Sequence, residues 1–126
     1  MCDVSISEIE KRVRDLIIDW VELHNYKVRP ESLETFEYSL KHVFGLEDRY
    51  IVRADLSLSA SGHIPTDFGM MRISFVYRGK LISCYAKLGV EYMHTKLSRS
   101  GADVEVHMTP IREKFVRTLE VHCAEV

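Results

Sequence analysis

The feature that most constrains the fold of this chain is an alternating apolar–polar segment, residues 70–87, divided by Arg78-Gly79. A two-residue connection that contains glycine is typical of a tight β-hairpin, and it sets Tyr77 opposite Lys80. Because a slip by one residue would mix the two faces, the pattern predicts a single register. One face is then apolar throughout and should be core, with Ile73 opposite Cys84, Phe75 opposite Ile82 and Met71 opposite Ala86.

The other face of this hairpin mixes polar, aromatic and aliphatic side chains. The same register places Arg72 opposite Tyr85 and Val76 opposite Leu81. The simplest interpretation is the solvated side of an antiparallel sheet. Arginine and tyrosine around an exposed aliphatic pair are, however, typical of surfaces that bind other proteins. We therefore take these four residues as candidate binding residues.

Residues 50–60 and 103–109 also alternate between apolar and polar side chains, and they predict further strands. Arg53 lies on the polar side of the first of them, where it would extend the candidate binding surface. Residues 90–97 are ambiguous, since Glu, Met, Lys and Leu favour a helix there and Val, Tyr and Thr favour a strand. We favour the strand, because one register with residues 103–109 then satisfies the apolar pairs and a charge pair together.

The predicted pairing of residues 90–97 with 103–109 would set His94 opposite His107, with Tyr92 on the same face. Two opposed histidines are close enough to share a metal ion. A structural zinc site usually takes four nitrogen or sulfur ligands, however, and no cysteine is expected nearby. We therefore predict no metal or other cofactor and assign these three residues to the binding surface.

Apolar spacings of three and four residues predict a long helix near the start of the chain and a second one after it. Ser5 and Ser7 are candidate caps for the first helix, which should end near residues 24–25. Pro30 suits the start of the second helix and Gly45 its end. The expected buried stripes are Ile6, Ile9, Val13, Leu16, Ile17, Trp20 and Leu23 in the first helix, and Leu33, Phe36, Leu40 and Val43 in the second.

A third helix is predicted over residues 110–123, capped by Thr109. Its apolar stripe would comprise Ile111, Phe115, Leu119 and Cys123. The predicted fold class is α+β: two N-terminal helices, a meandering antiparallel sheet of about five strands and one C-terminal helix, in two layers. A chain of 126 residues without a linker or an internal repeat should form this fold as one domain, residues 1–126.

Charge and cysteine content restrict the expected partners and location. With 17 Lys and Arg against 19 Asp and Glu, the net charge is −2, so no strongly positive field favours nucleic acid. No segment reads as a membrane span, and residues 1–5 do not open a signal peptide. Cys2, Cys84 and Cys123 are widely spaced and predict reduced thiols. We therefore expect a cytoplasmic protein without a membrane or nucleic-acid partner.

Catalytic signatures are missing from the sequence, which has no phosphate-binding glycine loop, metalloprotease motif or nucleophile elbow. We predict a small non-enzymatic binding module that pairs with itself as a dimer, or with a partner protein, through its open sheet face. Its role would be that of an inhibitor, an adaptor, an immunity-type protein or a phage or viral accessory protein. The alternative is a small-ligand-binding or hydrolytic domain that uses the loop 61–69, where His63 and Asp67 supply an acid–base pair.

Overall fold

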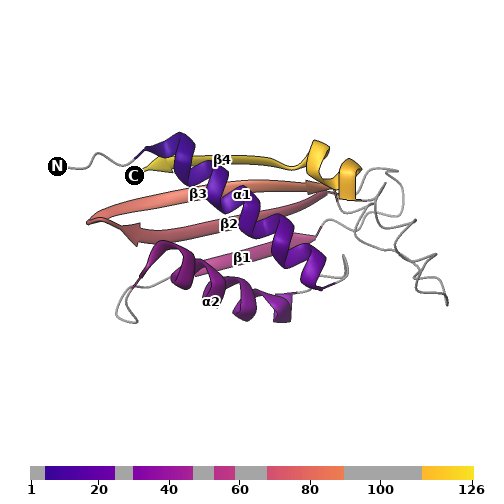
Figure 1. The fold of residues 1–126 in the computed structure, drawn as a ribbon, viewed down its shortest axis with the longest axis horizontal. Helices are drawn as coiled ribbons and strands as arrows, with labels where there is room; N and C mark the ends of the chain where they lie inside the picture. Colours follow the sequence, from indigo (N-terminus) through magenta and orange to yellow (C-terminus); the bar gives the residue numbers. More distant parts are fainter. Residues whose placement is uncertain (1–4, 25–29, 47–52, 59–67, 90–111) are drawn as a thin grey trace.

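An antiparallel sheet and two long helices make up most of the described fold (Figure 1). The structure is a computed structural model, and it describes residues 5–24, 30–46, 53–58, 68–89 and 112–126. The sheet has four strands in the order β1-β2-β3-β4. The elements are α1 (Ile6–Leu23), the 3-10 helix η1 (Pro30–Ser32), α2 (Leu33–Phe44), β1 (Arg53–Leu58), β2 (Phe68–Tyr77), β3 (Lys80–Gly89) and β4 (Glu120–Glu125). The predicted α+β class with an antiparallel sheet is confirmed.

The ends of both long helices follow from local sequence signals. The Ser5 hydroxyl accepts a hydrogen bond from the Glu8 N–H, one of the amides that the first turn of a helix leaves unpaired. Pro30 begins η1, which leads directly into α2. Gly45 ends α2 in the left-handed conformation, at a φ of 62°. The predicted limits of α1 and the predicted end of α2 are therefore confirmed, whereas α2 itself begins at Leu33, after the 3-10 turn that Pro30 opens.

The buried sides of the helices differ from the predicted stripes at two positions. Leu23 is 73% exposed and Val43 is 37% exposed, although their spacing predicts both as core. Ile18, Val21 and Phe44 are buried instead. The reason is that each helix packs against the sheet and also against a neighbouring helix, so its buried arc is broader than one stripe and is turned away from these two residues.

The hairpin of β2 and β3 has the register that the sequence predicts. Tyr77 pairs with Lys80, and every apolar and polar pair along the hairpin then falls as expected. Arg78 and Gly79 have φ angles of 52° and 78°, and two consecutive positive angles identify a type I′ turn. This turn matches the twist of the two strands, which is why a connection of only two residues can close the hairpin.

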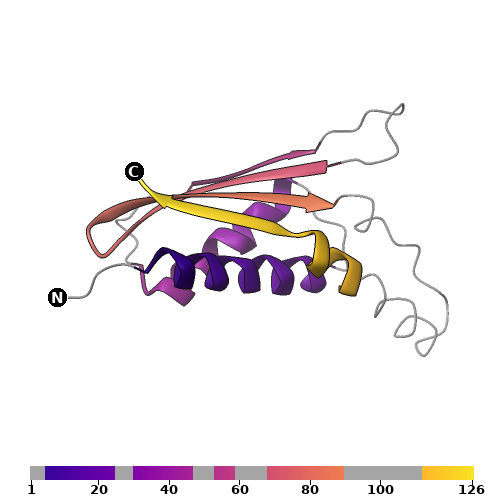
Figure 2. The same cartoon turned by 90° about the horizontal axis from the view of Figure 1, so that it is seen from above.

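Helices α1 and α2 lie on the same side of the sheet (Figure 2). We call the sheet face toward these helices the inner face. Its side chains are fully buried at Met71, Ile73, Phe75 and Ile82. The Phe75 ring lies 4.9 Å from the ring of Phe44 on α2. Each such side chain contributes about 1.5–3 kcal/mol on burial, so much of the stability of this fold comes from the inner face.

The predicted helix over residues 110–123 is wrong in its second half. The helix covers residues 112–118, and the chain then continues as β4 alongside β3. The Arg14 guanidinium of α1 donates to the carbonyls of Val116 and Leu119 at 2.6 and 2.9 Å, so the orphan acceptors at the helix end are satisfied there. Pairing with β3 satisfies the backbone groups that follow, and this tertiary contact overrides the helical spacing.

Two further expectations are corrected by β4. Cys84 and Cys123 face each other across β3 and β4 and form a disulfide, so these two cysteines are not the reduced thiols that the sequence predicts. Because the two cysteines are 39 residues apart in the chain, their spacing does not indicate that they pair directly across two strands. The described residues form four strands rather than about five, and one of the four is β4. The predicted strands at 90–97 and 103–109 lie outside the described residues.

Candidate protein-binding surface

The sheet face opposite α1 and α2, which we call the outer face, is built from alternate residues of neighbouring strands. No described helix lies over it (Figure 2). The strand registers align its side chains in rows that cross the sheet. Crossing β2, β3 and the C-terminal segment in that order, the rows are Arg72–Tyr85–His122, Ser74–Ser83–Ala124 and Val76–Leu81–Val126. The Val126 N–H donates to the Leu81 carbonyl at 2.9 Å and so continues the ladder beyond β4.

Large apolar side chains are exposed on this outer face. Leu81 is 44% exposed and Tyr85 is 40% exposed, although both lie on a strand with neighbours on each side. Arg72 beside Tyr85 is exposed, and Val76 beside Leu81 is half-buried. A single exposed leucine is common on protein surfaces, whereas an exposed aliphatic pair and a tyrosine–arginine pair on one sheet face are typical of interfaces.

The row between the apolar row and the Arg72 row contains only small side chains. Ser74 is half-buried, and Ser83 and Ala124 are exposed. These side chains are smaller than those of the rows on either side. Another protein surface can approach the backbone more closely there than at either flanking row.

The structure brings together four of the eight predicted binding residues. Arg72, Val76, Leu81 and Tyr85 share the outer face in the predicted pairs. Arg53 lies opposite Ser74 in the register of β1 with β2, which places its backbone at the edge of the sheet. The remaining predicted residues, Tyr92, His94 and His107, lie outside the described residues, as does the loop 61–69 with His63 and Asp67.

The C-terminal segment contributes a part of this surface that was not predicted from the sequence. His122, Ala124 and Val126 are all exposed beside β3. Their signal is an alternation in which Val121 and Cys123 point to the inner face. That period of two was hidden by the period of four at Phe115, Leu119 and Cys123, which is also compatible with a helix.

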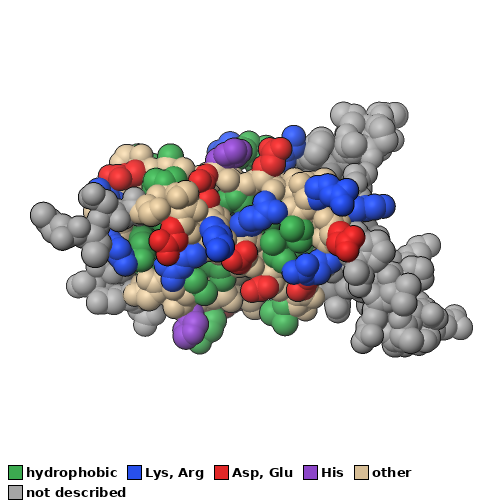
Figure 3. All heavy atoms as spheres, turned by 45° about the horizontal axis from the view of Figure 1, so that its top comes forward, with side chains coloured by type: hydrophobic (Ala, Val, Ile, Leu, Met, Phe, Trp, Pro, Cys, Tyr) green, Lys and Arg blue, Asp and Glu red, His purple; other side chains and the backbone are tan. Residues whose placement is uncertain are grey.

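The helix side offers a second exposed apolar region, distinct from the outer face. A hollow of about 250 Å³ between α1 and α2 is lined by Leu16, Trp20, Leu23, Tyr38 and Val43 together with Asp19, Ser39 and His42. The indole N–H of Trp20 donates to the Ser32 carbonyl at 3.0 Å, so this donor is satisfied within the protein. Figure 3 shows acidic and basic side chains interspersed on this side, with small apolar patches between them. The lining of the hollow thus combines apolar side chains with one carboxylate, that of Asp19.

Neither a metal centre nor a membrane span occurs within the described ranges. No three His, Cys, Asp or Glu side chains there gather closely enough to hold a metal ion. None of the helices that the structure describes is both long and apolar enough to cross a bilayer.

Comparison of the chain with models of protein families, with curated proteins and with solved structures gives no match.

Proposed function

We propose that this protein is a binding module, not an enzyme, and that its outer face docks against the same face of a second copy. The observation that carries the proposal is the exposure of Leu81 and Tyr85 on the same face of β3, one on each side of Ser83. Exposed aromatic and aliphatic side chains in a flat surface gain free energy when another surface excludes water from them. Tyrosine and arginine are also the residues that most often dominate binding energy, which favours Tyr85 and Arg72 as anchors.

The order of the rows favours a second copy as the occupant. In such a dimer the two-fold axis would lie between the two faces and run along the small row at Ser83. It would set the apolar row of one copy against the Arg72–Tyr85 row of the other. Leu81 would then meet the ring of Tyr85 and the aliphatic stem of Arg72. The two Arg72 side chains would lie on opposite sides of the axis, so the interface would not oppose like charges.

The experiment compares the assembly of two matched double variants. Arg72→Glu with Leu81→Asp alters the outer face, and Lys11→Glu with Leu23→Asp makes the same chemical changes on the helix side. Both leucines are exposed, at 44% and 73%, and Lys11 and Arg72 are exposed too. Sedimentation gives the mass of each assembly, and thermal unfolding reports its stability.

We expect the wild type and the helix-side variant to sediment at twice the chain mass of 14.6 kDa. The outer-face variant should sediment at the mass of one chain. In solutions dilute enough that the wild type has dissociated, its stability should lie within about 0.5 kcal/mol of wild type, as is usual for surface substitutions. A wild type that stays at the mass of one chain, or an outer-face variant that still dimerises, would overturn the proposal.

The inhibitor, adaptor, immunity-type and phage or viral roles stay predictions from the sequence. The same holds for ligand binding or hydrolysis by His63 and Asp67 in the loop 61–69. The dimer is the part of the functional hypothesis that the residues of the outer face support directly.

A further inference from the structure

One row of four residues crosses the whole sheet on its inner face. Ala54 on β1 pairs with Ile73, Ile73 pairs with Cys84, and Cys84 pairs with Cys123 on β4. The first and last residues of this row lie on β1 and β4, the two outermost of the four strands that the structure describes. Edge strands carry main-chain N–H and C=O groups that no neighbouring strand satisfies, and another chain can pair with them.

The direction of the edge amides in this row follows from the register. Opposed pairs in an antiparallel ladder alternate between those that exchange both hydrogen bonds and those that exchange none. The two-residue turn makes Tyr77–Lys80 a bonded pair, and counting back along the hairpin makes Ile73–Cys84 another. The main-chain groups of Ile73 and Cys84 therefore point at each other, and the N–H groups of Ala54 and Cys123 point out of the sheet at opposite edges.

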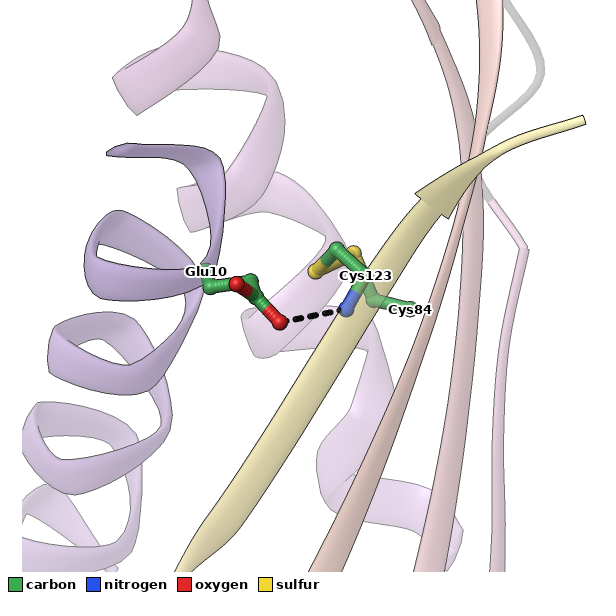
Figure 4. The surroundings of a disulfide bond; sticks show 3 residues. All are labelled: Glu10, Cys84 and Cys123. Carbon is green, nitrogen blue, oxygen red and sulfur yellow. Dashed lines mark hydrogen bonds between the residues drawn. A yellow bond between two sulfur atoms is a disulfide. The ribbon is translucent and has the colours of Figure 1, made fainter. Parts of the chain in front are cut away.

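A helix glutamate occupies each of these two outward positions. The Cys123 N–H donates to Glu10 Oε2 of α1 at 3.0 Å (Figure 4). The Ala54 N–H donates to Glu37 Oε1 of α2 at 3.3 Å. Both bonds are part-buried, and a charged acceptor makes such bonds stronger than a neutral one does. Helices α1 and α2 thus each place a carboxylate at one end of the same row.

We infer that Glu10 and Glu37 are edge guards, which close the two edges of the sheet to strand addition by a second copy of this chain. An added strand would have to donate and accept at the same main-chain groups. Each carboxylate already holds one outward-pointing amide of its edge, and an incoming strand carries carbonyl oxygens that the negative charge would repel. Removing the carboxylates leaves one outward amide at each edge free to pair with a strand of a second copy.

This inference is independent of the proposed outer-face dimer. The guards lie on the inner-face side at the edges, whereas Arg72 and Leu81 lie on the outer face. Variants of the guards are therefore made in the chain that carries Arg72→Glu and Leu81→Asp, so that outer-face docking does not contribute to the measured mass.

The experiment compares two pairs of substitutions in that chain. Glu10→Ala with Glu37→Ala removes both acceptors, and Glu10→Gln with Glu37→Gln keeps an acceptor oxygen of the same reach. We expect the alanine pair to form larger species whose amount rises with concentration in sedimentation. The glutamine pair should form at least tenfold less of them. An alanine pair that keeps the mass of its parent, or a glutamine pair that assembles equally, would overturn the inference.

Amide hydrogen exchange in the unsubstituted chain gives a second test, which does not depend on whether the alanine pair folds. Alternation points the amides of Val121 and Cys123 out of the same edge, and only the second of them donates to Glu10 in the structure. We expect the Cys123 amide to exchange at least tenfold more slowly than the Val121 amide, the ratio that one net hydrogen bond of ordinary strength supplies. Equal rates for the two amides would contradict a guard at this position.

Discussion

The two faces of the β2–β3 hairpin share one backbone and differ in how far their side chains are exposed to solvent. On the inner face Ile73, Phe75 and Ile82 are 0% exposed. On the outer face Leu81 is 44% exposed and Tyr85 is 40% exposed. Because successive side chains of a strand point to opposite faces, one position along the chain separates a residue that stabilises the fold from one that is available for binding. Substitutions on the two faces should therefore have effects of different kinds.

The largest effect is expected on the inner face. Phe75→Ala should lower the free energy of unfolding by about 3–5 kcal/mol, because it removes a fully buried ring that packs against Phe44. Leu81→Ala on the outer face of β3 is the matched control. In solutions dilute enough that the chain is a monomer, it should change stability by no more than about 0.5 kcal/mol. Chemical denaturation measures both. If Phe75→Ala costs less than about 1 kcal/mol, the two faces do not differ in the way described.

The next largest effect concerns the disulfide, which also lies on the inner face. Replacing Cys84 and Cys123 by alanine together should lower the free energy of unfolding by about 2–4 kcal/mol, since the bridge closes a loop between residues 39 apart. Ser83→Ala, one position away on the outer face, should leave stability nearly unchanged.

Thiol labelling gives a direct check of the same bridge. A thiol reagent should modify Cys84 and Cys123 in the unfolded chain only after a reductant has been added. Labelling of both residues without a reductant would show that they are not joined.

Local signals were enough to predict the hairpin and the two long helices. The Arg78-Gly79 turn and the strict alternation around it allow only one register, and Ser5, Pro30 and Gly45 mark helix ends through bonds made within a few residues. These features depend on neighbours in the chain. The same alternation separated Arg72 and Tyr85 from the core, so half of the candidate surface could be predicted.

The C-terminal segment could not be predicted in this way, because its structure depends on distant residues. Its helix ends where Arg14 binds the last carbonyls, and the strand that follows forms against β3. Cys123 fits a helical stripe and an alternating strand equally well, and only its position opposite Cys84 decides between them. Three features were missed for this one reason: the contribution of His122 to the outer face, the disulfide, and the hydrogen bond that the Cys123 N–H donates to Glu10.

The outer-face dimer is tested most directly at its proposed two-fold axis. With Cys2 replaced by Ser, Ser83→Cys would place one exposed thiol beside the axis, where two copies could join through a new disulfide. Ser7→Cys, an exposed position on α1, is the matched control. We expect mild oxidation to convert most of the Ser83→Cys chain into a covalent dimer on a non-reducing gel and to leave the control as single chains. Absence of that dimer, or equal cross-linking of the control, would contradict docking through the outer face.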